Sequence, residues 1–159
     1  MNSLKKFLLM LLMPILFTTH YVYASSIVLT QEQLTGIKKQ NMGEKWLMLL
    51  WSVDCPPCFK ELDMIQKLNK KQADLNVVLI NTDASEDTLL RRREIINKFQ
   101  LMDLPNFHFA ADQGAQSRFI IDPNWYGELP RSYFFESNGQ SHGKSGLVDE
   151  SLLVSWLGE

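Results

Sequence analysis

The stretch WSVDCPPCFKE, from Trp51 to Glu61, contains both cysteines of this 159-residue chain, Cys55 and Cys58. An apolar run ends at Trp51, and a helix-like segment follows the second cysteine. Two thiols at this spacing, where a strand ends and a helix begins, can close a small ring reversibly, which is the chemistry of dithiol–disulfide exchange. A purely structural bridge is disfavoured, because so small a loop restrains the unfolded chain very little.

The first 24 residues have the pattern of a secretory signal peptide. Lys5 and Lys6 precede the apolar run 7–17, and compact residues follow at the end of the segment. The run is about 11 residues long, short of the roughly 20 that span a bilayer as a helix. We therefore expect residues 1–24 to be a cleaved signal peptide and residues 25–159 to be one exported, periplasmic domain. An uncleaved N-terminal membrane anchor is the alternative.

The size and charge of the expected domain indicate a single globular domain that does not bind nucleic acid. Removing the signal peptide leaves 135 residues, and the formal charge changes from -2 to -4 because two lysines are lost. This length supports one ordinary core, and mild acidity without a basic stripe argues against nucleic acid as a partner. The three arginines at 91–93 are flanked by acids and are expected to be a solvent-exposed helix face. We expect a monomer with no metal or other cofactor besides the redox-active disulfide.

Hydrophobic periodicity predicts an alternation of helices and strands. Thr30 with Gln33 predicts a capped helix start, and Asn138-Gly139 predicts a hairpin turn. The expected helices cover 30–39, 59–71, 85–99 and 149–157, with a short helix or turn over 113–121, and the expected strands cover 45–51, 75–80, 107–110, 132–136 and 141–148. This order predicts an α/β architecture with a mixed sheet.

The stretch 51–61 resembles the active-site segment of the TlpA/ResA-like thioredoxins, a family of exported thiol–disulfide oxidoreductases. Glu61 stands where that family carries a glutamate after the second cysteine. The run LPRSYFF from Leu129, followed by Asn138-Gly139, resembles the family's cis-proline loop, strand and hairpin. The resemblance covers nearly all of residues 30–159. It implies a thioredoxin-like fold, a central mixed β-sheet flanked by helices, with a TlpA-type helix–strand insertion between 85 and 110, before the cis-Pro loop.

The positions of the motif also predict a reaction. Cys55 would lie exposed at a helix N-terminus, where free N–H groups and the helix dipole favour a thiolate, and would attack a partner disulfide. Cys58, one turn further along the helix, would then attack Cys55 and release the reduced partner. Glu61 is the natural acceptor of the Cys58 proton. The alternative for Glu61 is a plain solvent-exposed helix acid.

Four residues around the cysteines are expected to tune the redox potential: Trp51, Asp54, Pro56 and Pro57. Asp54 stands where the family often has tryptophan, and its negative charge next to Cys55 opposes formation of the thiolate. A less stable thiolate makes an exchanger more reducing. The sequence therefore favours a reductase.

Leu129 and Pro130 are expected to bind the partner protein. An X-Pro bond can be cis at modest cost, and a cis bend exposes the preceding backbone to an extended partner segment beside Cys55. The alternative is an ordinary trans proline at the start of a strand. Leu129 departs from the smaller or β-branched residue that is common in the family.

Three functions remain open. The favoured one is a reductase of exported partner proteins with thiols or disulfides; the resemblance implies substrates such as apocytochrome c or copper-centre assembly proteins, and a membrane dithiol electron donor. The second is an oxidase or isomerase of exported proteins. The third is a non-enzymatic binding module. It is either a copper-binding protein in which the cysteines act with His108 or His142, or a redox-gated binding partner. The strand and hairpin positions of these histidines favour structural or solvent roles.

Overall fold

A computed structural model describes residues 26–72 and 74–158 of the chain. The expected signal peptide, its cleavage site and the alternative membrane anchor lie outside these residues. Among the helices of the described part, none has both the length and the apolar character needed to cross a membrane.

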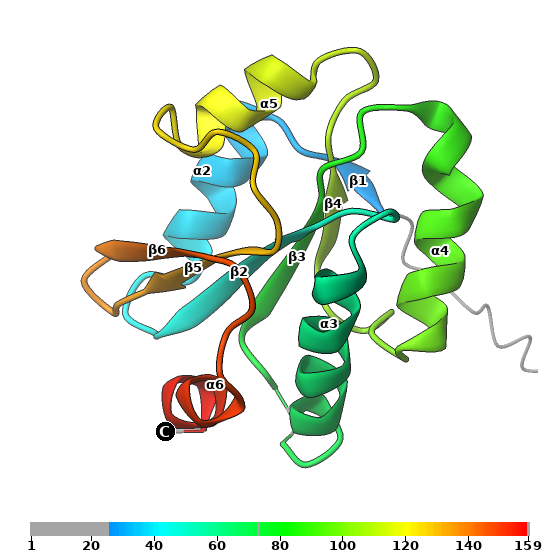
Figure 1. The fold of residues 1–159 in the computed structure, drawn as a ribbon. Coiled ribbons are helices and arrows are strands. Elements are labelled where there is room, and N and C mark those ends of the chain that lie inside the picture. The colour runs from blue at the N-terminus through cyan, green and yellow to red at the C-terminus, as the bar shows by residue number, and fades with distance from the viewer. Residues whose placement is uncertain (1–25, 73, 159) are drawn as a thin grey trace, which may run out of the picture.

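A mixed sheet runs through the centre of the described residues (Figure 1). Its strands are β1 (Ile27–Val28), β2 (Trp46–Trp51), β3 (Val77–Asn81), β4 (Asn106–His108), β5 (Arg131–Phe135) and β6 (Ser141–Ser145). The order across the sheet is β1-β4-β3-β2-β5-β6. The first four strands in this order are parallel, whereas β5 is antiparallel to both β2 and β6.

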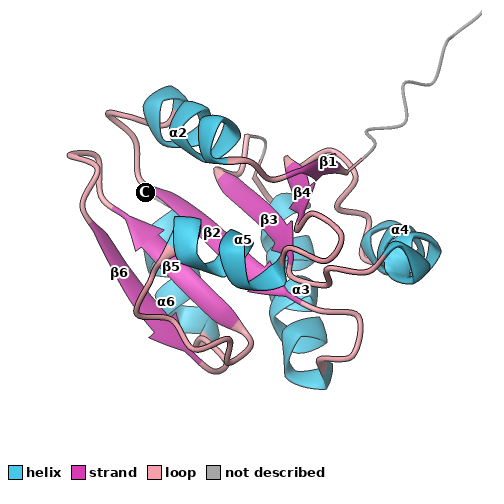
Figure 2. Ribbon diagram, turned by 90° about the horizontal axis from the view of Figure 1, so that it is seen from above, coloured by secondary structure: helices cyan, strands magenta, loops and turns pink. Residues whose placement is uncertain are grey.

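Helices cover both faces of this sheet (Figure 2). They are α2 (Gln31–Gln40), α3 (Pro56–Asn69), α4 (Leu89–Lys98), α5 (Gly114–Ile121) and α6 (Glu150–Leu157), and a short 3₁₀ turn precedes α4. Helices α3, α4 and α6 contribute buried side chains to the core on one face. Helix α2 contributes to the core on the other face, against which the end of α5 also packs.

Strand β2 is buried along its whole length because it lies between the two helical layers. Its side chains alternate between the two cores, as strand geometry requires. Leu49 and Trp51 point into the core shared with α3, whereas Met48 and Leu50 point into the opposite core. Burying one large aliphatic side chain contributes about 1.5–3 kcal/mol, so β2 is a stable base for the residues that follow it.

Capping interactions set the starts of two helices. The backbone N–H of Gln33 donates to Thr30 Oγ1 (3.2 Å), and the N–H of Thr30 donates to Gln33 Oε1 (2.9 Å), which confirms the predicted capping box. Helix α3 begins at Pro56, directly after Cys55, which confirms that the first cysteine lies at the helix N-terminus; the apolar pattern of 59–71 covers only the later turns. Cys55 caps this helix, and both prolines fit its first turn, where a missing N–H costs no hydrogen bond.

Several sheet boundaries differ from the prediction. Strand β1 has no counterpart in it and is a two-residue edge strand paired with β4. Strand β6 ends at Ser145 and not at 148, because Gly146 adopts a φ of +81° that turns the chain out of the sheet. Helix α4 and strand β4 occupy the segment expected to hold the extra helix and strand, and β4 lies between β1 and β3. Their equivalence to the TlpA-type insertion stays a prediction.

Candidate active site

The two cysteines form a disulfide at the N-terminus of α3, with their Cα atoms 5.3 Å apart. Cys55 is the N-cap, and its Sγ accepts a hydrogen bond from the backbone N–H of Cys58 (3.3 Å). Pro56 and Pro57 lie exposed between them. Cys55 keeps 8 % of its surface exposed and Cys58 none. The exposure predicted for Cys55 is therefore small in the disulfide state, but Cys55 is the more exposed of the two cysteines.

Glu61 is fully buried, so the alternative of a solvent-exposed helix acid is wrong. It follows Cys58 by three residues on α3, a spacing that places both side chains on one helix face. Ser132 Oγ donates a hydrogen bond to Glu61 Oε1 (2.5 Å), while Oε2 has no hydrogen-bond partner among the described residues. Burial raises the pKa of Glu61 to about 7, and the Ser132 hydrogen bond opposes this effect. Such a carboxyl can take up or release a proton near neutral pH.

The loop from β2 to Cys55 is held by Asp83, a residue with no role in the sequence prediction. Asp83 Oδ1 accepts a hydrogen bond from Ser52 Oγ (2.7 Å), and Oδ2 accepts from the backbone N–H of Val53 (2.9 Å). Asn81 Nδ2 also donates to Oδ2 (2.8 Å). Strands β2 and β3 are parallel neighbours, so their carboxyl ends meet at one edge of the sheet. An acid two residues after the end of the second buried strand is the sequence signal that indicates this contact.

Asp54 forms an ion pair with Arg91, which lies on α4 (Oδ1 to Nη1, 2.9 Å). Both side chains are more than half exposed, so solvent screens the pair. The guanidinium still offsets part of the negative charge next to Cys55. The ion pair thus weakens the electrostatic argument that Asp54 makes the protein reducing.

Trp51, the last residue of β2, is buried and packs in the same core as Cys55 and Cys58. Close to it lies Arg92 of α4, and both residues border a small cavity between α4 and the sheet. The prediction of a solvated face over 91–93 is wrong for Arg92, of which only 5 % is exposed. Arg92 shares the buried side of α4 with Ile96, four residues further on.

The Leu129–Pro130 peptide bond is cis, so the alternative of a trans proline is wrong. Arg131, the next residue, pairs with Leu50 across β5 and β2. Pro130 therefore lies at the end of β2 from which the chain continues to Cys55. Leu129 packs against the cores on both faces of the sheet. The two predicted partner-binding residues are thus at the same end of the sheet as the cysteines.

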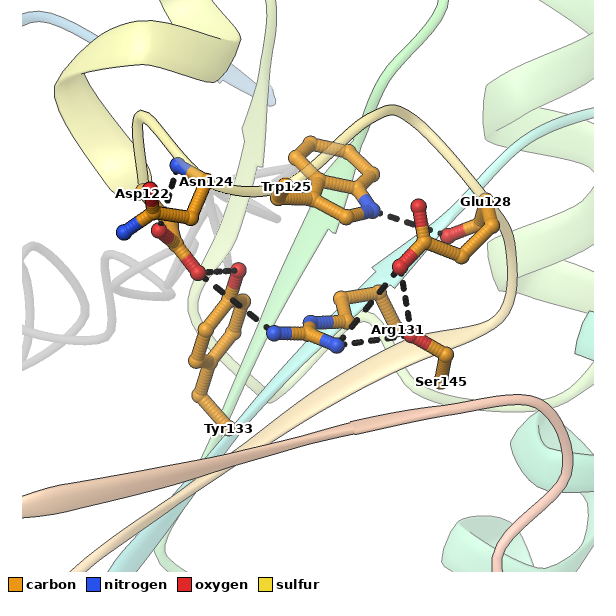
Figure 3. Close-up of polar contacts among 7 residues, drawn as sticks. All are labelled: Asp122, Asn124, Trp125, Glu128, Arg131, Tyr133 and Ser145. Carbon is orange, nitrogen blue, oxygen red and sulfur yellow. Dashed lines mark hydrogen bonds and ion pairs between the residues drawn. The ribbon is translucent and has the colours of Figure 1, made fainter.

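A polar network holds the loop between α5 and β5 (Figure 3). Arg131 Nη1 donates to Ser145 Oγ (2.6 Å), and Arg131 Nη2 lies 3.4 Å from Asp122 Oδ2. Ser145 Oγ donates to Glu128 Oε1 (2.5 Å), and Tyr133 OH donates to Asp122 Oδ2 (3.0 Å). Both ends of the loop are therefore tied to β5 and β6, which defines the course of the chain into the cis-proline.

The two histidines considered for copper lie apart from each other in the sheet. His108 is on β4, with its Nδ1 2.8 Å from Ser26 Oγ, and burial lowers its pKa. His142 is on β6, opposite Phe134 of β5. Within residues 26–72 and 74–158, no three His, Cys, Asp or Glu side chains are placed to share a metal ion.

The sheet order, the two helical layers and the position of the disulfide define a thioredoxin-like fold. A secreted disulfide oxidoreductase of Mycobacterium tuberculosis, homologous to DsbE of E. coli, matches with a TM-score of 0.56 at 16% identity, over 76% of this chain and 84% of that chain. StoA from Bacillus subtilis matches with a TM-score of 0.54 at 20% identity, over 73% of this chain and 84% of that chain.

In sequence, the chain is homologous to ResA thiol-disulfide oxidoreductases. It is 28% identical over 118 residues to ResA of Bacillus thuringiensis, which covers 74% of this chain and 64% of the relative. The chain thus spans less than two thirds of the length of the curated relatives it matches. No family model matches the chain.

Proposed function

We propose that this protein is an exported thiol–disulfide oxidoreductase that works through the Cys55–Cys58 couple. The observation that carries the proposal is a disulfide at the N-terminus of α3 with a buried carboxyl, Glu61, three residues after its inner sulfur. Homology to proteins named thiol-disulfide oxidoreductases supports the same chemistry.

The exchange follows from the different accessibility of the two sulfurs. In the reduced protein, the Cys55 thiolate attacks a partner disulfide, the partner S–S bond breaks, and the leaving thiolate takes a proton. The Cys58 thiolate then attacks Cys55 Sγ and displaces the second partner thiolate, which is also protonated. The partner gains two electrons and two protons, and the Cys55–Cys58 couple is oxidised.

Glu61 supplies a place for the proton that Cys58 must lose. A buried thiol forms its reactive thiolate reluctantly, because the charged form is desolvated. Glu61 Oε1 is engaged by Ser132, which leaves Oε2 to accept the proton. The pKa of about 7 allows this acid to receive and return a proton at neutral pH.

We assign the remaining predicted site residues to redox tuning and to partner binding. Trp51 and Asp54 act on the redox potential through the packing and the charge next to Cys55, and Pro56 and Pro57 act through the start of the helix. For Leu129 and Pro130, the resemblance to the TlpA/ResA-like family and the position at the same end of the sheet support binding of an extended partner segment.

The direction that we infer is reduction of exported partner proteins, such as apocytochrome c or copper-centre assembly proteins. A membrane protein with its own dithiol would return the two electrons. Residues 1–24 would serve as the export signal or as a retained anchor. The secreted mycobacterial protein of the same fold supports export.

Trapping of the mixed disulfide tests the exchange. With a generic disulfide substrate such as insulin, we expect the Cys58→Ser variant to accumulate a covalent adduct through Cys55, visible on a non-reducing gel and cleaved by dithiothreitol. The matched Cys55→Ser variant should form no adduct and show no turnover. Undiminished turnover by Cys58→Ser would show that the two-cysteine mechanism is wrong.

The reduction potential of the couple tests the direction. It is measured by equilibrating the protein with glutathione or dithiothreitol buffers of known potential. A value near the thioredoxin end, about -270 mV or lower, supports a reductase, whereas a value near -120 mV, at the oxidising end, would make the protein a disulfide donor.

A further inference from the structure

A small cavity lies between α4 and the sheet, beside Trp51 at the end of β2. Trp51 of β2, Asn81 of β3 and Asn106 of β4 border it from the sheet, and Arg92 borders it from α4. Its volume is about 20 Å³. A single water molecule requires about 10–15 Å³ measured in this way, so the cavity accommodates one water molecule or one ion of similar size.

The buried polar groups at this cavity that lack a partner are all hydrogen-bond donors. Arg92 is 5 % exposed and Trp51 is 1 % exposed. Arg92 Nε and Nη1 and the Trp51 indole N–H have no hydrogen-bond partner in the described structure. Leaving a buried donor unpaired costs about 1–3 kcal/mol, more where the group is charged. An acceptor bound in the cavity would therefore stabilise the three unpaired donors of Arg92 and Trp51.

One side-chain acceptor that borders the cavity, the Asn81 amide oxygen, is already engaged. Asn81 Oδ1 accepts from the backbone N–H of Asp83 (3.1 Å). The Asp83 carboxylate, in turn, takes hydrogen bonds from Ser52, Val53 and Asn81. Between residues that the structure describes, no ion pair within 4.0 Å involves Arg92. The guanidinium is thus a buried positive charge without a counter-charge in contact, although the Asp83 carboxylate attracts it from beyond ion-pair distance.

We propose that this cavity is a binding site for one small monovalent anion of halide size. A water molecule would accept from two donors at most and bring no charge, whereas an anion accepts from all three and neutralises the guanidinium. The bound anion lies against the last residue of β2, directly before the Ser52–Val53 segment that Asp83 holds, so its occupancy changes the charge at the base of the active-site loop.

The indole N–H of Trp51 reports directly on this site. We would titrate the oxidised, full-length protein with sodium chloride against sodium gluconate at constant ionic strength and record the indole resonances by ¹⁵N–¹H NMR. The Trp51 signal is assigned with a Trp51→Phe variant. We expect a saturable shift of this one signal, with the indoles of Trp46, Trp125 and Trp156 unmoved.

Two variants on α4 provide the matched comparison. Arg92→Gln should weaken chloride binding at least tenfold, whereas Lys98→Gln, which removes an exposed positive charge at the end of the same helix and away from the cavity, should leave the titration unchanged. A second readout on the unmodified protein is broadening of the ³⁵Cl resonance that bromide reverses. A Trp51 signal that does not saturate with chloride, together with no reversible ³⁵Cl broadening, would mean that the cavity holds only water and would overturn the proposal. Neither readout requires thiol exchange, so this result is independent of the proposed function.

Discussion

At the scale of single residues, the protonation of Glu61 connects the site to stability. Burial raises its pKa in the folded protein to about 7 from 4.5. The folded state therefore holds this proton more tightly than the unfolded state does, and the stabilising contribution is complete below pH 4.5 and lost as the pH rises through about 7. Relative to Glu61→Gln, we expect the oxidised protein to lose about 3 kcal/mol of unfolding free energy across this window. Denaturant titrations at a series of pH values measure this loss.

Ser132 provides the control for that experiment. Its hydrogen bond lowers the pKa of Glu61, so Ser132→Ala should extend the loss of stability to higher pH, and Ser132→Thr, which keeps the hydroxyl, should restore the original profile. A result in which the unfolding free energies of Glu61→Gln and of the unmodified protein change with pH in the same way would show that Glu61 does not titrate in this range and is not the proton acceptor at neutral pH.

The exposed pair of Asp54 and Arg91 gives a prediction on the redox potential. Asp54→Asn removes a negative charge beside Cys55 and should make the potential less negative, whereas Arg91→Gln removes the compensating charge and should make it more negative. Because solvent screens both groups, we expect shifts on the order of 10 mV, measured in glutathione buffers. Arg93→Gln, on the same helix and exposed, is the control. Shifts of the same sign in both variants would exclude a direct electrostatic effect.

At the scale of elements, the Asp83 carboxylate connects the end of β3 to the loop that carries Cys55. Asp83→Ala leaves the Val53 N–H and the Ser52 hydroxyl without their acceptor. We expect a loss of about 1–3 kcal/mol in unfolding free energy and faster hydrogen exchange at the Val53 amide. Asp87→Ala, an exposed acid of the neighbouring turn, should change neither. If the hydrogen exchange of the Val53 amide is the same in Asp83→Ala as in the unmodified protein, the loop is held by its local backbone hydrogen bonds and not by Asp83.

The elements also show what local sequence patterns can and cannot predict. The capping box at Thr30, the hairpin at Asn138-Gly139 and the helix after the cysteines depend on neighbouring residues, and their patterns predict them. The contact of Ser132 with Glu61 spans 71 residues, and that of Asp83 with Val53 spans 30. Such contacts depend on which strands become neighbours, and periodicity carries no information on that.

The arginine triplet at 91–93 illustrates the same limit. Its charge pattern indicates a solvated face, yet the packing of α4 on the sheet buries the middle residue. Strand β1 could not be predicted from periodicity either. It has only two residues, both with partly exposed side chains, and two residues do not make a periodic pattern.

At the scale of the whole molecule, β2 is the strand on which both cores and the site depend. Leu49 is fully buried in the core beneath α3, so Leu49→Ala should cost about 2–5 kcal/mol of unfolding free energy. Val154→Ala on α6, where the side chain is 45 % exposed, is the matched comparison and should cost far less. Thermal or denaturant unfolding measures both. A cost for Leu49→Ala no greater than that for Val154→Ala would contradict the central place of β2.

The two prolines at the start of α3 are exposed and donate no backbone hydrogen bonds. The chain before them is fixed from the sheet through Asp83, and the helix after them is fixed through Glu61 and Ser132. The Pro-Pro dipeptide is therefore an exchangeable module. We expect its replacement, during evolution or engineering, to change the reduction potential of the proposed couple while the cis-proline segment at the same end of the sheet keeps its course.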